Sequence, residues 1–341
     1  MKSFRKPRLD AFAAAVEARL KPLQTAPQGK TAQQRRADAA AFDPIMSREL
    51  GIEPIDVATE EHTLPVPGHP DVRLRVYWPT TERPAATTEG PGLPVLVYFF
   101  GGGFEIAGID WVSWDARFRE RAHDAGVIVV AGEYSHAPEV KFPAQPEQCW
   151  TVFEWAAEHA RELGGDPERM ALGGGSAGGN LATATALMNR DRANRPVRLL
   201  LLEVPLLDMT MRHMASQPGI PAFLFRKLAG TIVTQYLGKT TALRRNPYAS
   251  PLLAPSLAGM PQTVIYTAEL DALRGDGEAF ARALGEAGVP VSCIRLIGQN
   301  HGSAGYQRHS ATADHLHRDI VATLRTLHDQ PVPYPTPGGA R

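Results

Sequence analysis

The chain has 341 residues, a length that a single α/β domain with an added cap commonly reaches. Lysine plus arginine and aspartate plus glutamate are equal at 36 each, so the formal net charge is zero and nothing draws the whole chain toward nucleic acid or an anionic membrane. With 43% hydrophobic residues and no run of transmembrane length, the composition predicts a globular protein without membrane insertion, expected in the cytoplasm.

The first 50 residues indicate helices rather than strands. The N-terminus is basic and then apolar, as in a signal peptide, but the apolar part is short and Asp10 and Glu17 interrupt it. The apolar residues instead mark one face of a helix: Leu9, Phe12, Val16 and Leu20.

Strand candidates begin at Val72–Trp78, where apolar and polar residues alternate. Helical patterns separate the later candidates, and this alternation predicts a doubly wound α/β sheet with helices on both faces. The later candidates are continuous apolar runs, which are typical of strands buried on both faces of a parallel sheet: Val95–Phe100, Val127–Ala131, Met170–Gly173, Leu199–Val204, Thr263–Ala268 and Val291–Leu296.

Residues 209–245 interrupt this alternation with an apolar helix candidate, PAFLFRKLAGTIVTQYL, that no strand follows until Thr263. Together with helices in residues 1–50, this insertion is expected to form a helical cap over a core that spans residues 51–330. Residues 331–341 are rich in proline and glycine and are expected to form a disordered tail. The two cysteines, Cys149 and Cys293, are interpreted as small core residues rather than a disulfide or a metal pair.

The stretch LGGGSAGGN, residues 172–180, fits two motifs at once. Its GGSAG is the G-x-S-x-G pattern of a nucleophilic serine, here Ser176, and its GGGSAG is the G-x-G-x-x-G pattern of a dinucleotide site. Both motifs need a strand, a turn and a helix, which the sequence supplies. The dinucleotide interpretation has an acidic residue, Glu203, at the end of the next strand, but the turn lies in mid-chain rather than in the first β-α unit.

The serine interpretation requires two further residues. A serine hydroxyl needs a neutral histidine to accept its proton, and the histidine needs an acid to hold its tautomer. In this kind of fold the acid and the histidine follow the serine, on loops at strand ends. Asp271 and His301 stand at such positions. Glu269 and Asp276 are rivals for the acid, and Asp271 would alternatively serve only as the N-cap of the next helix.

The stretch FGGGF, residues 100–104, follows an earlier strand. Three successive glycines allow backbone N–H groups to face a nucleophile without steric cover, as an oxyanion site requires. This stretch therefore completes the set of parts that acyl transfer needs.

Together these segments resemble the hormone-sensitive-lipase family of α/β-hydrolases, in the bacterial esterase branch with the His-Gly-Gly-Gly motif. The similarity extends from about Val95 to beyond His301. It is also carried by the following segments: Tyr134, Ala137-Pro138-Glu139, Phe142-Pro143-Ala144, Gly174 to Asn180, Pro205-Leu206-Leu207-Asp208, Ser250-Pro251-Leu252 and Ala268 to Arg274.

The resemblance implies a mostly parallel eight-stranded sheet flanked by helices, with a helical cap. It aligns the family's acid with Asp271, which decides between the acidic candidates. It also assigns the oxyanion donors to the amides of Gly102, Gly103 and Ala177.

The sequence departs from the family pattern at three places. Phe100 replaces the histidine before the three glycines, Gly175 replaces the aspartate before the nucleophile, and Ser135-His136 replaces an Arg-Leu pair. Phenylalanine cannot donate the hydrogen bonds of a histidine. Either an aromatic ring simply packs well at this strand end, or the site is adapted to a larger apolar or natural-product substrate.

The sequence therefore predicts a serine carboxylesterase that hydrolyses carboxylic esters of modest acyl length through an acyl-enzyme, with no cofactor and no metal. Three alternatives remain: a specialised amidase, lactonase, acyltransferase or cyclase on the same triad, a non-catalytic small-molecule binding protein, and a dinucleotide-binding oxidoreductase. The apolar cap run would line an acyl pocket or pack in a homodimer, and the sequence does not decide between these: Phe223, Leu224, Phe225, Leu228 and Ile232.

Overall fold

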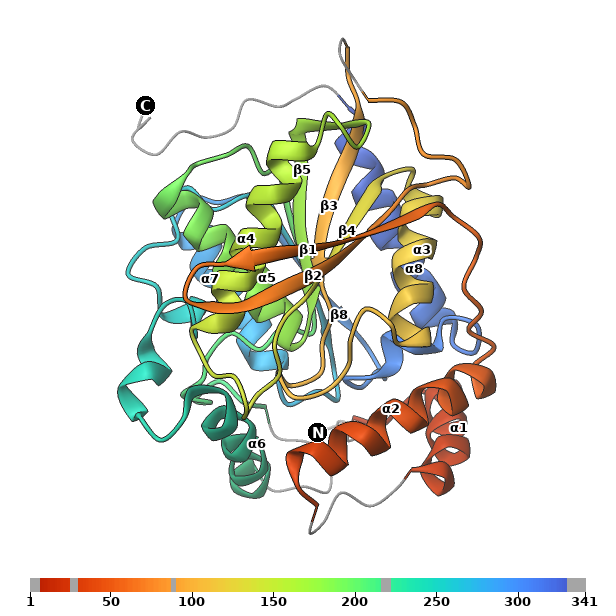
Figure 1. The fold of residues 1–341 in the computed structure, drawn as a ribbon. Helices are drawn as coiled ribbons and strands as arrows, with labels where there is room; N and C mark the ends of the chain where they lie inside the picture. Colours follow the sequence, from red (N-terminus) through yellow and green to blue (C-terminus); the bar gives the residue numbers. More distant parts are fainter. Residues whose placement is uncertain (1–6, 25–29, 87–89, 216–221, 330–341) are drawn as a thin grey trace.

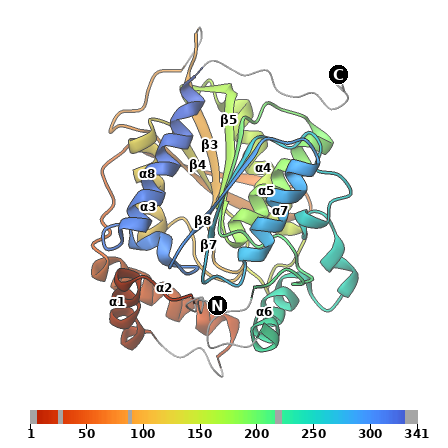
Figure 2. The same ribbon diagram turned by 180° about the vertical axis from the view of Figure 1, so that it is seen from behind.

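The computed structural model describes residues 7–24, 30–86, 90–215 and 222–329, with only the backbone in 222–228. A twisted sheet crosses the centre, and helices cover both of its faces (Figures 1 and 2). The strands, in the spatial order of the sheet, are β1 (Thr59–Val66), β2 (His69–Tyr77), β4 (Ile128–Glu133), β3 (Leu93–Phe99), β5 (Gly165–Gly175), β6 (Leu199–Glu203), β7 (Thr263–Ala268) and β8 (Val291–Leu296).

Pairing is antiparallel from β1 to β2 and from β2 to β4, and parallel between all later neighbours. The predicted mostly parallel, eight-stranded sheet is therefore confirmed. The central strands β3, β4, β6 and β7 are almost wholly buried, which explains their continuous apolar sequences.

The strand β1 was not predicted from the sequence. Its sequence, TEEHTLPV, is polar at most positions, and five of its eight residues are exposed or half-exposed in succession before the first buried one. An edge strand needs only one apolar side, so β1 lacks the apolar run by which the other strands were recognised.

Two groups of helices sandwich the sheet. On one face lie α3 (Val112–Ala125) and α8 (Ala311–Arg325), and on the other lie α4 (Ala144–His159), α5 (Ala177–Arg192) and α7 (Arg274–Glu286) (Figure 1). The parallel strands all end at the same edge, and the loops that follow them gather there.

Three further helices cover that edge, and we call them the cap helices: α1 (Ala11–Leu20), α2 (Ala32–Glu49) and α6 (Ala222–Leu237) (Figure 1). The division of the chain into a cap and a core stays a prediction. The predicted apolar run of the cap falls in α6. Its side chains at Phe223, Leu224, Phe225 and Leu228 lie outside the described residues, as does the predicted tail at 331–341. Over the part of the chain that is described, no helix is long and apolar enough to cross a membrane.

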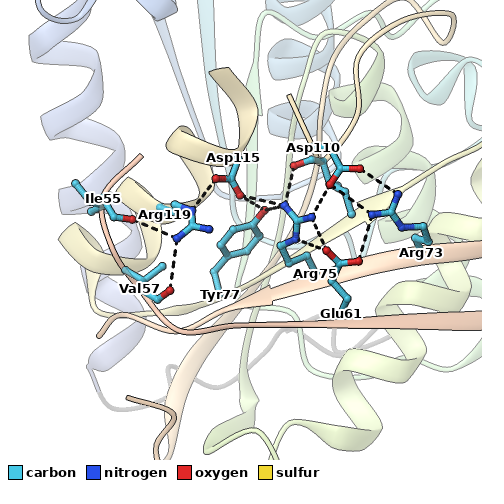
Figure 3. A network of polar contacts seen from close by, with 10 residues as sticks. Ile55, Val57, Glu61, Arg73, Arg75, Tyr77, Asp110, Asp115 and Arg119 are labelled. Atoms are coloured by element: carbon cyan, nitrogen blue, oxygen red, sulfur yellow. Dashed lines mark hydrogen bonds and ion pairs between the residues drawn. The ribbon is translucent and has the colours of Figure 1, made fainter. Parts of the chain in front are cut away.

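Charged side chains join β2 to the start of α3 (Figure 3). Arg75 on β2 lies 3.1 Å from the carboxylate of Asp115, and Arg119, one turn along α3, lies 2.6 Å from the same carboxylate. Arg119 also donates to the backbone carbonyls of Ile55 and Val57, ahead of β1. The network fixes α3, and therefore the segment that follows the glycine stretch 100–104, against the sheet.

The two cysteines differ in their surroundings. Cys149 is buried in α4, as predicted, but Cys293 is exposed on the edge strand β8, so its assignment to the core was wrong. An edge strand is covered on fewer sides than a central one, which the apolar neighbours of Cys293 in the sequence did not reveal. Both thiols are free.

Candidate active site

Ser176 stands between β5 and α5 in a strained backbone conformation, with φ 55° and ψ −117°. Such a conformation costs about 1–3 kcal/mol and persists only where the surroundings hold it. The flanking glycines make it possible: a Cβ at Gly174 would overlap the backbone of Gly178, and one at Gly178 would overlap the carbonyl oxygens of Phe99 and Phe100. The Ser176 N–H donates to the carbonyl of Glu203 at 2.9 Å, which anchors the turn to β6.

The structure brings the three predicted side chains together. Nε2 of His301 lies 2.9 Å from Oγ of Ser176, and Nδ1 of His301 lies 2.8 Å from Oδ2 of Asp271. Asp271 is buried, with 3% of its side chain exposed, whereas the imidazole is 43% exposed. The buried carboxylate of Asp271 thus contacts one side of the His301 ring, and the hydroxyl of Ser176 contacts the other side, nearer to solvent.

Asp271 also forms a turn just ahead of the next helix. Its second oxygen, Oδ1, accepts a hydrogen bond from the Leu273 N–H at 2.9 Å, just before α7 begins. The N-cap of α7 is Leu273, and no side chain caps it, so the alternative of Asp271 as the N-cap was wrong. The rival acids point elsewhere: Glu269 accepts from the Gly298 N–H, and Asp276 accepts from the backbone of the segment after β6.

The electrostatic environment acts on His301 in two directions. The partial burial of the ring lowers the pKa of the imidazole, because loss of hydration disfavours the charged form. The neighbouring carboxylate of Asp271 favours the charged form and outweighs burial, so the pKa of His301 is raised above its ordinary value of 6.5. A ring that attracts a proton and already contacts a hydroxyl is suited to general-base chemistry.

The glycine stretch passes beside the nucleophile. A Cβ at Gly101 would lie 3.1 Å from Cβ of Ser176. Gly102 and Gly103 have φ values of 151° and 60°, in the region that favours glycine, and a Cβ at Gly102 would overlap the carbonyl of Ile106. No hydrogen bond between described residues uses the N–H of Gly102, Gly103 or Ala177, so these amides are available as donors.

Phe100 fills an aromatic site. Its side chain is buried and stacks on Tyr134, with 4.4 Å between the ring centroids. The hydroxyl of Tyr134 donates to the carbonyl of Phe100 at 3.0 Å. The ring therefore packs as a core residue at the end of β3, as one of the two interpretations of Phe100 expects.

Gly175 faces a space that aromatic side chains already occupy. A Cβ at this position would lie 3.4 Å from the hydroxyl of Tyr98 and 3.5 Å from the ring of Trp114. Both distances are ordinary van der Waals contacts, so these side chains leave little room beyond a Cβ. The replacement of the family's aspartate by glycine thus fits this chain's own packing.

Glu203 is buried under the nucleophile and is not free to bind a ribose. It pairs with Arg121 of α3 and accepts a hydrogen bond from the hydroxyl of Tyr98 at 2.7 Å. Burial raises the pKa of this carboxyl, but the charges of Arg121 and Arg117 and the hydrogen bond from Tyr98 together more than offset it, so the pKa of Glu203 is lowered. The acidic residue that the dinucleotide interpretation required is thus engaged inside the protein.

Two residues, one in α1 and the other its N-cap, hold the loop of His301, and neither contact was predicted from the sequence. Glu17 accepts hydrogen bonds from the amide of Asn300 at 2.8 Å and from the hydroxyl of Tyr306 at 2.6 Å. Asp10, at the start of the same helix, donates its N–H to Gly298. No local pattern could have revealed these contacts, because Asp10 uses a backbone N–H that any residue offers and Glu17 lies 283 positions from Asn300.

In the described ranges, no group of three or more histidine, cysteine, aspartate and glutamate residues is suited to hold a metal ion. The arrangement of Ser176, His301 and Asp271 uses only side chains and backbone of this chain.

Comparisons with known proteins agree with this geometry. A family model described as the alpha/beta hydrolase fold matches residues 96–305. The chain belongs to this family. The resemblance to its hormone-sensitive-lipase branch is confirmed by the relatives below.

The carboxylesterase NlhH of Mycobacterium tuberculosis is 34% identical over 279 residues, which cover 80% of this chain and 84% of the relative. Among solved structures, an esterase of Pyrobaculum calidifontis is 30% identical with a TM-score of 0.80 and covers 94% of this chain and 99% of its own. A bacterial heroin esterase is 31% identical with a TM-score of 0.80, covering 94% and 98%. The chain is thus a member of a family of carboxylic ester hydrolases.

Proposed function

We propose that this protein is a serine carboxylesterase in which Ser176 attacks the carbonyl carbon of an ester. His301 accepts the proton of the Ser176 hydroxyl and then donates it to the leaving alcohol, while Asp271 holds the ring and stabilises its charged form. Water then attacks the acyl-enzyme, with His301 as the base, and releases the acid. The observation that carries the proposal is the pair of contacts at 2.9 Å and 2.8 Å that joins the three side chains.

The amides of Gly102, Gly103 and Ala177 are proposed to bind the oxyanion that forms on the carbonyl oxygen. Ala177 is the first residue of α5, where N–H groups have no partner within the helix. The helix dipole adds partial positive charge at the same point. Removal of one such donor typically costs about 3 kcal/mol of transition-state stabilisation, so the three amides would supply much of the rate.

We propose carboxylic esters of small molecules with a modest acyl length as the substrates. A relative named as an ethyl acetate hydrolase of Pseudomonas putida supports short acyl groups, and one named as an arylesterase of Saccharolobus solfataricus supports aryl esters. No cofactor is needed for the steps above. The cytoplasm remains the proposed location.

The test is hydrolysis of p-nitrophenyl esters from acetate through butyrate and octanoate to palmitate. Wild type should cleave the shorter esters, Ser176→Ala should not, and the exposed Ser256→Ala should behave as wild type. Mass spectrometry should find an organophosphate adduct on Ser176. A wild type that neither hydrolyses these esters nor forms the adduct would contradict the proposal and favour a binding protein.

A second candidate, a specialised acyl-transfer enzyme on the same three residues, is favoured by the departures at Phe100 and Gly175. Comparison with Phe100→His separates the two. Because Phe100 is buried and stacked on Tyr134, histidine there should lower stability and bring no gain in hydrolysis of simple esters. A gain in Phe100→His over an inactive wild type would instead indicate a site adapted to another acyl acceptor or substrate.

A further inference from the structure

Glu105 lies directly after the glycine stretch and is buried, with 7% of the residue exposed. An ionised carboxylate in such a place needs partners to offset its loss of hydration. Two cap helices provide them. Arg35 of α2 contacts Oε1 of Glu105 through Nε at 2.8 Å and Nη2 at 2.7 Å. The side-chain amide of Gln235 in α6 bridges these two residues. Its nitrogen donates to Oε2 of Glu105 at 2.6 Å, and its oxygen accepts from Nη2 of Arg35 at 2.8 Å.

The backbone of the same segment is also tied to α2. Arg36 donates from Nε to the carbonyl of Glu105 at 2.8 Å and from Nη2 to the carbonyl of Ala137 at 3.1 Å. The Ala137 N–H donates to the carbonyl of Phe104 at 2.8 Å. Adjacent arginines of one helix thus hold the side chain and the main chain of the same residue.

A second contact with α6 lies beside the first. The rings of Phe104 and Tyr236 stack with 3.8 Å between centroids and 4° between planes. Both side chains are completely buried. The segment therefore has α2 on one side and the C-terminal half of α6 on the other.

The segment needs such support because its backbone is strained. Phe104 and Ala107 have φ values of 63° and 76°, which residues with a side chain rarely adopt, and they follow two glycines with positive φ. Strained conformations persist only where surrounding contacts over-determine them. Within the turn itself, Glu105 and Ile106 donate to the carbonyl of Gly102, which alone does not explain two non-glycine residues in this region.

We propose that Arg35, Glu105 and Gln235 form a clamp through which the cap helices α2 and α6 hold the amides of Gly102 and Gly103 in position for the oxyanion. The three are positioning residues and do not touch the substrate. The inference rests on the proposed function, because it concerns the oxyanion site of that reaction. It makes the cap a part of the catalytic apparatus as well as a cover for it.

The clamp has a specific kinetic signature. Displaced amides would bind the oxyanion less well but would leave the neutral ester ground state almost unaffected, so kcat should fall while KM changes little. A trifluoromethyl ketone forms a tetrahedral adduct with a serine and places an oxyanion in the same site. Its inhibition constant should therefore rise in proportion to the loss of kcat/KM.

The experiment compares wild type, Glu105→Gln, Arg35→Gln and the double variant with p-nitrophenyl acetate and a trifluoromethyl ketone. We expect each single variant to lose on the order of tenfold in kcat/KM, and the double variant to lose little more, because residues of one network are not additive. The matched control is Glu154→Gln on α4. This substitution removes a carboxylate whose two oxygens lie 2.6 Å and 3.0 Å from the guanidinium of Arg195. It should keep wild-type kinetics.

Thermal unfolding of every variant shows whether a loss reflects fewer folded molecules. Should Glu105→Gln fail to fold, Arg35→Lys and Gln235→Ala provide the test, since both residues lie at the half-buried rim of the clamp. Active-site titration with an organophosphate then normalises kcat to folded sites.

Folded Glu105→Gln or Gln235→Ala with kcat within twofold of wild type would overturn the clamp. So would a rise in KM alone, or loss of kcat without weaker binding of the ketone. Failure of the proposed function looks different, because wild type itself would then neither hydrolyse the ester nor bind the ketone.

Discussion

Oγ of Ser176 lies 2.9 Å from Nε2 of His301, although 125 positions of the chain separate the two residues. The opposite ring nitrogen, Nδ1, lies 2.8 Å from the carboxylate of Asp271. A carboxylate at Nδ1 favours the tautomer with its proton there, which leaves Nε2 free to accept the proton of the serine. This ordered arrangement determines how activity should depend on pH.

We expect kcat/KM of wild type to rise with pH through the pKa of His301, because only the neutral ring accepts a proton. Asp271 raises that pKa above the ordinary value of 6.5, so the acidic limb should lie above this value. Asp271→Asn removes the raising charge, and its acidic limb should therefore move to lower pH. Its plateau should fall on the order of 10⁴-fold, because asparagine favours the wrong tautomer.

The measurement is the rate of p-nitrophenyl acetate hydrolysis between about pH 5 and 9, with the organophosphate labelling rate as a second readout for the slow variant. Glu269→Gln is the matched control, since its carboxylate accepts from the Gly298 N–H instead of facing the ring. An acidic limb at the same pH in Asp271→Asn and wild type would show that the carboxylate does not set this pKa.

Glu17→Gln tests whether α1 positions the loop of His301. Glu17 accepts both hydrogen bonds, from Asn300 and Tyr306, on the same oxygen, Oε1, and the neutral amide oxygen of glutamine accepts hydrogen bonds less strongly than a carboxylate. The weakening is worth about 1 kcal/mol, so we expect kcat to fall by about threefold to tenfold and the melting temperature by about 1–2 °C.

The control for Glu17→Gln is Glu49→Gln. The exposed carboxylate of Glu49, on α2, pairs with Arg19 of α1 at 3.3 Å. Steady-state kinetics with p-nitrophenyl butyrate and thermal unfolding provide the comparison. Equal kcat for both variants would show that α1 packs beside the loop without positioning it.

Much of the fold could be predicted because buried parallel strands have a distinctive sequence. Runs such as Leu199–Val204 and Val291–Leu296 coincide with β6 and β8 to within one residue. The edge strand β1 lacked this signal. The turn at Ser176 was recognisable because steric exclusion at Gly174 and Gly178 leaves no other residue possible, and that constraint is visible in the sequence itself.

Contacts between distant segments left no such trace. Arg35 and Glu105 are separated by 70 positions, and Glu17 and Asn300 by 283. In the sequence, each of these residues is one charged or polar residue among many on an exposed-looking helix or loop. Their roles follow from where the cap helices pack, which no local pattern determines.

Gly178→Ala should prevent correct folding of the turn at Ser176. An added Cβ would overlap the carbonyl oxygens of Phe99 and Phe100, and backbone atoms in the central sheet cannot move aside. We expect insoluble protein or a loss of more than about 4 kcal/mol of unfolding free energy, as for other severe overpacking. Gly230→Ala is the matched control, because nothing lies within 4 Å of its Cβ position in α6.

Alanine at position 230 should instead stabilise the helix by roughly 0.5–1 kcal/mol. Chemical denaturation of both variants beside wild type measures the contrast. If Gly178→Ala were stable and active, the backbone near Ser176 would be able to move aside for the added Cβ. The turn, with its φ of 55° at Ser176, would then not be held rigidly.

Asp276→Asn should change how stability depends on pH. Asp276 is completely buried at the start of α7 and accepts hydrogen bonds from the N–H groups of Leu207 and Asp208 at 2.9 Å and 3.0 Å. Burial raises its pKa to about 7, from an ordinary value of 3.8, despite these two donors. The folded state therefore binds a proton that the unfolded state releases between these values.

A raised carboxyl pKa contributes stability that is complete below the unfolded value and is lost as pH rises toward the folded value. Wild type should thus lose roughly 2–4 kcal/mol of unfolding free energy between about pH 4 and 7 from this group alone. Asparagine keeps an oxygen for the two N–H donors and carries no charge. The unfolding free energy of Asp276→Asn, relative to that of wild type, should therefore be higher at pH 8 than at pH 5. Urea unfolding at both pH values measures this, with the exposed Asp314→Asn as the control. Parallel pH profiles for Asp276→Asn and wild type would show that Asp276 is ionised in the folded protein at an ordinary pKa.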